Sequence, residues 1–169
     1  MKTLPERLLT AASCGEKGSV IADVGCDHGL LPHYLLKKGI SVFAYLIDKN
    51  RGPLLRAAQN TEKYGLSDSC AHVVSDGLKE LNTFISDNNV PAGIPDTVIM
   101  TGMGGPLILK IIDEAPEEIK RNVSTFILSP QSLIEDCKEG LRERGFMIRD
   151  EKMVSDKGKH YTIIKGEIN

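Results

Sequence analysis

The chain alternates short, continuous apolar runs with segments whose apolar residues recur every three or four positions. The apolar runs predict strands at Ser19–Val24, Val42–Ile47, Ala71–Ser75, Thr97–Thr101 and Ser124–Leu128. The periodic segments predict helices at Leu4–Ser13, Leu30–Lys38, Gly52–Tyr64, Leu78–Ile85, Gly105–Glu114 and Leu133–Arg144. Short apolar strands separated by amphipathic helices are typical of a parallel sheet covered on both faces, with right-handed crossovers.

The C-terminal part of the chain has a different pattern. Phe146–Val154 and His160–Lys165 flank a glycine-containing turn at 155–159, which predicts a β-hairpin. We therefore expect an α/β fold with a Rossmann-like, doubly wound sheet of seven strands, mostly parallel, with an antiparallel hairpin strand at its C-terminal edge. No long linker divides the sequence, so a single domain over residues 1–169 is predicted. The loosest segment, Ser86–Pro95, is predicted to be an exposed loop.

The turn after the first predicted strand is the strongest indication of function. Residues 20–29 read VIADVGCDHG, which predicts a buried strand, a tight turn that lets backbone approach a ligand, and a helix that starts at the turn. The next apolar run ends in a second acid, Asp48. A glycine turn after one strand and an acid at the tip of the next is an arrangement that holds a nucleoside by its ribose hydroxyls. The sequence therefore predicts a nucleoside-containing cofactor.

The same turn argues against a phosphate-containing cofactor. A dinucleotide fingerprint, G-x-G-x-x-G, counted from Gly25 would place glycines where the chain has Asp27 and Leu30. A carboxylate at Asp27 would also repel a pyrophosphate bound at the helix N-terminus. No G-K-S or G-K-T of a P-loop occurs. S-adenosylmethionine fits better, because it offers a ribose diol to Asp48 and a cationic amino acid end to Asp23 or Asp27.

Two further strand tips agree with this interpretation. Ser75-Asp76-Gly77 places an acid suited to an adenine amino group, and residues 101–105, TGMGG, would leave room beside a reacting methyl group. The predicted cofactor-binding residues are Asp23, Gly25, Cys26, Asp27, Asp48, Asp76, Gly77, Gly102, Met103 and Gly104. The structural alternatives are that Asp23 and Asp27 only cap the following helix, and that Asp48 and Asp76 are plain turn residues.

Composition narrows the class of protein. Hydrophobic residues make up 41% and charged residues 26% of the 169 residues, as in an ordinary globular domain. The net charge of −2 and the pI near 6.1 argue mildly against a nucleic-acid binder. No apolar run is long enough to span a bilayer, and no signal peptide is visible. The four cysteines are scattered, which predicts a reducing cytoplasm with neither disulfides nor a metal site.

At these motifs the chain resembles the class I methyltransferases, and more closely a bacterial tRNA (adenine-N1)-methyltransferase family. That family has an L-x-x-R-L helix, matched by residues 4–8, and A-D-I-G-S-D-H-x-x-L-P, matched by residues 22–32. The remaining matches follow in order at Gly52-Pro53, Asp76-Gly77-Leu78, Gly102-Met103-Gly104-Gly105 and Lys159-His160-Tyr161. The resemblance covers nearly the whole chain.

The resemblance implies S-adenosylmethionine-dependent methylation of adenine N1 in tRNA, by a cytoplasmic enzyme. It implies catalytic roles for Asp27, His28, Ser129 and Gln131. The loop at Ser129-Pro130-Gln131-Ser132 departs from the family's Q-P-N, and Asp48 replaces a frequent Glu. Familiar members also carry a C-terminal helical domain that is absent from these 169 residues, so the sequence is expected to be either a natural short form or the catalytic domain alone. The alternatives are a methyltransferase for a small molecule and a non-catalytic S-adenosylmethionine-binding module.

The residues alone leave the roles of several side chains open. His28 either orients the substrate or braces its loop. No stacking partner for a target base can be named, and the tyrosines Tyr34 and Tyr161 are expected to serve in packing. Contacts with RNA backbone and a simple solvated face explain Arg7, Lys37 and Lys38 equally well. Structural or surface positions are expected for His33, His72 and His160.

Overall fold

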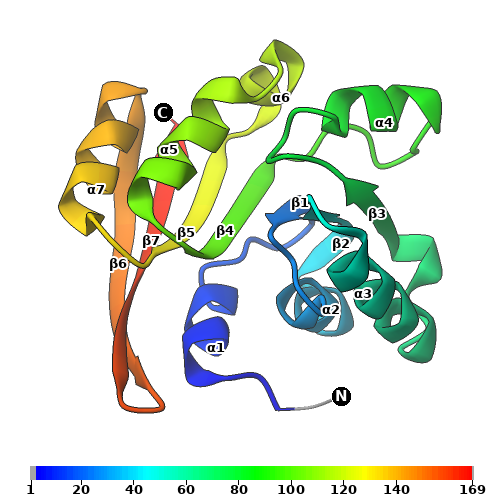
Figure 1. Ribbon diagram of the computed structural model, residues 1–169, viewed down its shortest axis with the longest axis horizontal. Coiled ribbons are helices and arrows are strands. Elements are labelled where there is room, and N and C mark those ends of the chain that lie inside the picture. Colours follow the sequence, from blue (N-terminus) through cyan, green and yellow to red (C-terminus); the bar gives the residue numbers. More distant parts are fainter. Residues whose placement is uncertain (1–2, 169) are drawn as a thin grey trace.

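A computed structural model describes residues 3–168 (Figure 1). The strands are β1 (Ser19–Val24), β2 (Ser41–Asp48), β3 (Cys70–Val74), β4 (Thr97–Met103), β5 (Thr125–Pro130), β6 (Phe146–Asp156) and β7 (Lys159–Ile168). The helices are α1 (Glu6–Ala12), α2 (Leu30–Lys37), α3 (Arg51–Lys63), α4 (Leu81–Asp87), α5 (Gly105–Glu114), α6 (Glu117–Asn122) and α7 (Ile134–Glu143), with a short 3₁₀ helix η1 (Ser67–Ser69). No helix among residues 3–168 is long and apolar enough to cross a membrane.

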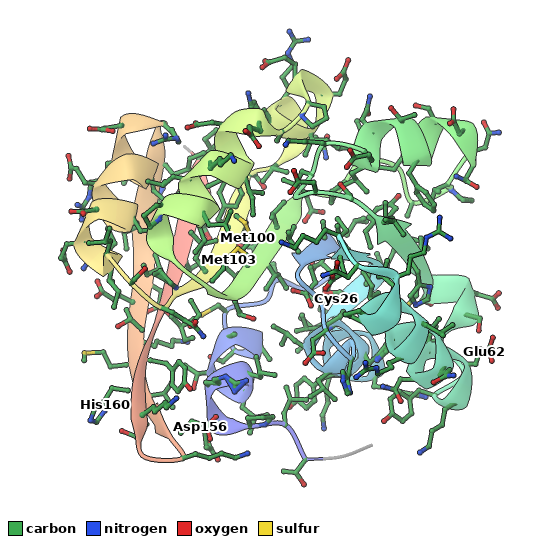
Figure 2. The ribbon with its side chains drawn as sticks, viewed as in Figure 1. Cys26, Glu62, Met100, Met103, Asp156 and His160 are labelled. Atoms are coloured by element: carbon green, nitrogen blue, oxygen red, sulfur yellow. The ribbon has the colours of Figure 1, made fainter. Side chains whose placement is uncertain are left out.

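The seven strands form one sheet in the order β3-β2-β1-β4-β5-β7-β6. Neighbours from β3 through β5 pair in parallel, whereas β7 is antiparallel to both β5 and β6. The predicted fold class, a mostly parallel doubly wound sheet with an antiparallel C-terminal hairpin, is confirmed. The hairpin turns at Lys157 and Gly158, whose φ angles of 49° and 77° suit a two-residue turn. Asp156 and His160 flank this turn at the hairpin's end (Figure 2).

Successive residues of the central strands face two different cores. In β1, Ile21 packs in the cluster formed with α1, α2 and α3, whereas Ala22 and Val24 pack in the cluster formed with α4, α5, α6 and α7. Asp23 therefore shares the face of Ile21, because side chains alternate along a strand. This alternation places a carboxyl group at the buried carboxyl end of an otherwise apolar strand.

Some element boundaries differ from those predicted. β4 continues to Met103 and β5 to Pro130, so Gly102 and Ser129 belong to strands and not to the loops after them. Helix α4 begins at Leu81, three residues later than expected, because the Glu80 carboxylate accepts hydrogen bonds from the preceding Ser75–Asp76 turn. Part of the predicted loop Ser86–Pro95 is helical, since α4 extends to Asp87. Helix α6 was not predicted; its sequence, EEIKRN, carries only one buried residue, Ile119.

Candidate functional site

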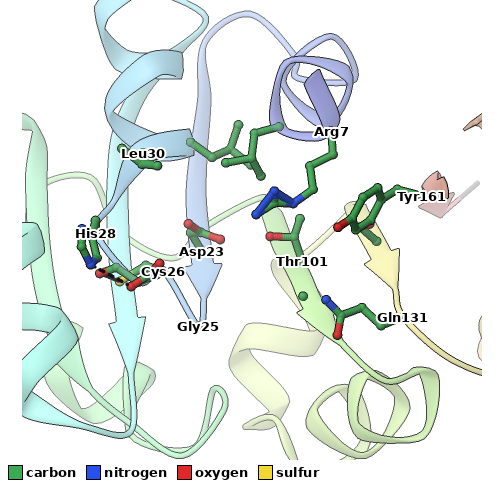
Figure 3. Close-up of a pocket in the computed structure, with 14 residues that line it drawn as sticks. Arg7, Asp23, Gly25, Cys26, His28, Leu30, Thr101, Gln131 and Tyr161 are labelled. Carbon is green, nitrogen blue, oxygen red and sulfur yellow. Dashed lines mark hydrogen bonds and ion pairs between the residues drawn. The ribbon is translucent and has the colours of Figure 1, made fainter. Parts of the chain in front are cut away.

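A cavity of about 290 Å³ lies at the carboxyl ends of β1, β4 and β5, beside the turn that follows β1 (Figure 3). Its lining residues come from both ends of the chain: Arg7, Leu8, Asp23, Gly25, Cys26, Asp27, His28, Leu30, Leu31, Thr101, Gly102, Ser129, Gln131 and Tyr161. The structure thus brings together all four residues that were expected to be catalytic. It also brings in half of the predicted cofactor set, from Asp23 to Asp27 and Gly102.

Asp23 is the buried acid of this cavity. Only 4% of the residue is exposed, and its carboxylate receives no hydrogen bond from the described residues. Burial, reinforced by the negative charge of Asp27, raises the pKa of Asp23 to about 8. A buried carboxyl without a partner is costly in its ionised form. Its geometry suits a ligand that brings its own cation into the cavity.

The turn from Gly25 to Gly29 is held by backbone hydrogen bonds. The amides of Gly25 and Cys26 both donate to the carbonyl of Ile47, at 2.8 and 3.0 Å, and the Gly29 amide donates to the Cys26 carbonyl at 2.8 Å. Gly25, Asp27 and Gly29 all have positive φ, at 75°, 50° and 73°. Such a conformation is strained for Asp27, and strained residues often mark functional turns. Helix α2 starts directly after this turn, so its N-terminus points at the site.

Asp27 and His28 interact at the exposed edge of the turn. His28 Nε2 lies 3.3 Å from Asp27 Oδ1, and these side chains are 44% and 76% exposed. The His28 carbonyl accepts a 3.0 Å hydrogen bond from the side-chain amide of Asn60 on α3. Backbone bracing of the loop therefore comes from Asn60, while the His28 imidazole remains beside the cavity (Figure 3).

Asp48 and Asp76 end neighbouring strands but do not line this cavity. Asp48 is half-buried, and its Oδ1 accepts a 2.8 Å hydrogen bond from the Asn50 amide. Asp76 is exposed and lies 2.8 Å from the Lys79 ammonium, whose hydrogen bond lowers the pKa of Asp76. Gly77 has a φ of 65°, and a Cβ there would lie 3.1 Å from Ile111. These residues lie after the carboxyl ends of β2 and β3, at the same edge of the sheet as the cavity but outside its lining.

The glycines after β4 serve two different purposes. Gly102 lines the cavity, and a Cβ there would lie 3.8 Å from the side-chain nitrogen of Gln131. Gly104 does not line it: a Cβ there would lie 2.7 Å from Ser132 Oγ, so its missing side chain admits a neighbouring loop. Met103 also lies outside the lining set, although its methyl group faces Gly25. From the sequence, these residues were expected to form one open space.

The β5 residues meet the end of β4. Ser129 is buried, with 4% of the residue exposed. The backbone N–H of Gln131 donates a 3.0 Å hydrogen bond to the Met103 carbonyl. The Gln131 side chain points towards the cavity from one side, and Asp23 lies across from it (Figure 3). An amide group, a hydroxyl group and a carboxyl group thus border one space, which suits recognition of a polar heterocycle.

Arg7 and Tyr161 are residues of this cavity that were not expected from the sequence. The Arg7 guanidinium lies over the Tyr161 ring, 5.5 Å from its centroid, and 3.4 Å from Asp156. Arg7 comes from α1 and Tyr161 from β7, so only tertiary pairing joins them. Thr101, the first residue of the TGMGG motif, also lines the cavity. The one signal available was that both Arg7 and Tyr161 fall in motifs of the resembling family.

His33, His72 and His160 lie outside the lining of this cavity. His33 is fully buried and lies 2.7 Å from the Thr61 hydroxyl, which also lies 3.0 Å from His72. Burial lowers the pKa of His33 to about 4. All four cysteines are free, and residues 3–168 contain no cluster of three or more His, Cys, Asp or Glu suited to a metal. His160 is exposed beside Ser155 on the hairpin.

Comparison with known proteins relates the chain to a methyltransferase domain family. A family model described as "Methyltransferase domain" matches residues 4–164. A Bacillus subtilis protein named tRNA (adenine(22)-N(1))-methyltransferase is 29% identical over 164 residues, which are 97% of this chain and 65% of that protein. The chain therefore spans less than two thirds of the length of this curated relative.

Solved structures agree with the sequence comparison. M. capricolum TrmK, in complex with S-adenosyl-homocysteine, has a TM-score of 0.86 at 25% identity over 99% of this chain and 70% of that one. A Streptococcus pneumoniae protein in complex with S-adenosyl-L-methionine has a TM-score of 0.87 at 29% identity, over 99% of this chain and 74% of that one. The resemblance to bacterial tRNA (adenine-N1)-methyltransferases that the motifs indicate is confirmed.

Proposed function

The chain belongs to the methyltransferase domain family, and we propose that it transfers the methyl group of S-adenosylmethionine to N1 of an adenine in tRNA. The observation that carries the proposal is the Asp23 carboxyl, which is buried at the cavity wall without a hydrogen-bond partner among the described residues. The Bacillus subtilis relative suggests adenine 22 as the target. This chain spans 65% of that relative, so tRNA methylation has to be measured with this chain itself.

The residues of the site fit this cofactor. Asp23 would bind the cationic amino group of the methionine moiety, and the ligand's charge would stabilise the carboxylate that burial otherwise disfavours. Gly25 has a φ of 75°, and a Cβ built there would meet only the Met103 methyl group, at 3.4 Å, so the missing side chain would let the cofactor approach the backbone. Asp48, at the tip of the next strand, would accept hydrogen bonds from the ribose hydroxyls. Asp76 and Gly77 would border the adenine ring.

Methyl transfer depends more on the placement of adenine N1 against the methyl group than on acid–base catalysis. S-adenosylmethionine supplies a methyl group already activated by its sulfonium, and adenine N1 attacks as a neutral lone pair. The protein's task is to hold N1 in line with the methyl group. Gln131 and Ser129, at the carboxyl end of β5, would contact the base, and Gly102 would leave room for it. The product adenine is cationic, and the exposed Asp27 carboxylate would stabilise it.

N1 is hidden in a paired adenine, so the target base must be unpaired or extruded before it enters the cavity. His28 lies 3.3 Å from Asp27 and would orient this carboxylate towards the base. This assigns His28 to substrate orientation, while Asn60 holds the loop backbone. The cytoplasmic location and the single-domain organisation stay predictions.

Two measurements test the proposal. Calorimetry with S-adenosylmethionine should show binding to the wild type, with affinity lost in Asp23→Asn and reduced in Asp48→Ala. Incubation with labelled S-adenosylmethionine should then methylate an unmodified tRNA transcript with adenine at position 22, and a transcript with guanine there should stay unlabelled. Nucleoside mass spectrometry would identify 1-methyladenosine as the product.

The same measurements separate the alternatives. Absence of cofactor binding by the wild type would overturn the proposal entirely. Cofactor binding without methyl transfer to any tRNA would favour a binding module or a small-molecule methyltransferase. Transfer to a different nucleoside would keep the reaction class and correct the target.

A further inference from the structure

The β6–β7 hairpin extends well beyond the strand that it borders. β5 pairs with β7 only from Thr125↔Glu167 to Leu128↔Ile164, whereas β6 and β7 continue to pair as far as Asp156↔Lys159. Residues 153–162, the distal hairpin, therefore project past the carboxyl end of β5, at the edge where the cavity opens. The distal hairpin thus extends to the proposed methylation site.

The distal hairpin is fixed in place by Arg7 of α1. Arg7 Nη1 lies 3.4 Å from Asp156 Oδ2, and Asp156 is only 9% exposed. The same guanidinium lies over the Tyr161 ring, at 5.5 Å from its centroid. A half-buried cation held by an ion pair and an aromatic face gives Tyr161 a defined orientation. The ring lines the cavity, and in the view of Figure 3 Arg7 and Thr101 lie between it and Asp23.

The hairpin turn carries positive charge without local compensation. Lys157 and Lys159 are exposed, and neither ammonium has an ion-pair partner within residues 3–168. Asp156, the nearest acid in sequence, is already paired with Arg7. The turn therefore presents two free cations in a chain whose net charge is −2. The tight turn at Lys157-Gly158 holds the two lysines close to each other.

We propose that the distal hairpin binds the RNA substrate: Tyr161 stacks on the target adenine, and Lys157 and Lys159 contact phosphates next to it. This inference rests on the proposed function. An extruded base needs a stacking surface, and Tyr161 is the only Phe, Tyr or Trp among the described residues that line the cavity. Phosphate contacts by lysines supply affinity and position without reading sequence. An overall acidic chain can bind RNA if its cations are concentrated beside the site.

The lysines are tested with a charge-matched control. In Lys157→Ala/Lys159→Ala, the dissociation constant for a tRNA transcript, measured by filter binding, should rise on the order of tenfold. The slope of log affinity against log salt should fall by about two, because each lysine that is removed neutralised one phosphate. Lys17→Ala/Lys63→Ala removes the same charge from exposed positions before the start of β1 and at the end of α3, and it should bind like the wild type. S-adenosylmethionine affinity should be unchanged in both.

Tyr161 is tested by comparing two substitutions. Tyr161→Ala should lower kcat/KM for tRNA by roughly 5- to 150-fold, the range expected for loss of one base–aromatic stack. Tyr161→Phe keeps the ring and should stay close to the wild type. Cofactor affinity by calorimetry and thermal unfolding monitor the fold of both variants. Equal losses in the alanine and phenylalanine variants would show that the phenol hydroxyl, not the ring, carries the effect. That result would overturn the proposal that Tyr161 stacks on the target adenine.

Failure of this inference is distinguishable from failure of the proposed function. If the wild type methylates tRNA but both lysine double variants bind tRNA equally, the distal hairpin does not bind the RNA. If the wild type binds S-adenosylmethionine but neither binds nor methylates tRNA, both proposals fall. Weaker tRNA binding confined to the hairpin variant, with unchanged cofactor affinity, supports the hairpin specifically.

Discussion

Replacing Asp23 by Asn should make the cofactor-free protein less sensitive to alkaline pH. Asp23 is 4% exposed, and its pKa is raised from 3.8 to about 8, first by burial and second by the charge of Asp27. In the unfolded chain the carboxyl ionises near its ordinary pKa, whereas in the folded protein it holds its proton up to about pH 8. The unfolded state therefore binds fewer protons between these values, and stability falls as pH rises through this window.

The size of this effect follows from the pKa difference. Each pKa unit corresponds to about 1.4 kcal/mol, so over the three units from pH 5 to pH 8 Asp23 alone contributes a loss of about 4 kcal/mol of unfolding free energy. Asn has no proton to lose, so Asp23→Asn should lack this loss. The buried amide has an energy of its own, but that energy does not vary with pH. The quantity to compare between variants is therefore the change in unfolding free energy from pH 5 to pH 8, not the stability at either pH.

The assay is urea denaturation of cofactor-free protein at pH 5 and pH 8. Far-UV circular dichroism is the suitable signal, because the chain has no Trp. Asp27→Asn serves as the control, since its side chain is 76% exposed and its neutralisation should leave most of the pH dependence in place. If the wild type and Asp23→Asn lose the same free energy between pH 5 and pH 8, the carboxyl is not held neutral by burial and the reasoning is refuted.

Three further predictions concern the support of the cofactor turn. Gly29→Ala should lower the free energy of unfolding in urea by about 2–4 kcal/mol, because φ is 73° and the new Cβ would lie 2.6 Å from the His33 ring; Gly39→Ala, with φ 65° and open space, should lose only about 1–2 kcal/mol. Asn60→Ala removes the 3.0 Å hydrogen bond to the His28 carbonyl and should raise the KM for S-adenosylmethionine several-fold at a stability cost of about 1 kcal/mol; an unchanged KM would contradict this bracing role. Because burial lowers the pKa of His33 to about 4, stability present above pH 6.5 should fall by about 2 kcal/mol on going to pH 5, and His33→Gln should not show this fall in the same urea assay.

Local patterns were sufficient to predict most of the fold. The strands are short and apolar, and the turn at Lys157-Gly158 has its own glycine signal, so the order of elements and the hairpin could be predicted. Helix α6 was missed because its polar sequence has a single apolar anchor, Ile119, which shows no periodicity. The ends of β4 and β5 were missed because Met103 and Gln131 pair through backbone groups, which carry no sequence signal.

The site was predictable where it is built from one continuous turn. Asp23, residues 25–28 and Gly102 line one cavity, because parallel strands present their carboxyl ends at one edge. Arg7 and Tyr161 could not be placed, since their contact joins residues more than 150 positions apart. The close neighbour of Gly104 could not be predicted for a similar reason: it is Ser132, which is distant in sequence.

The position of β7 in the sheet has a consequence for how the protein acquires its activity during synthesis. All six other strands leave the ribosome before β7, yet β7 lies between β5 and β6. Until it emerges, β5 has an open edge and β6 has no partner, so the nascent chain exposes an aggregation-prone surface. The Rossmann-like half that contains Asp23 can form early, whereas the wall formed by Tyr161 cannot. The nascent protein should therefore become able to bind its cofactor before it can bind its substrate.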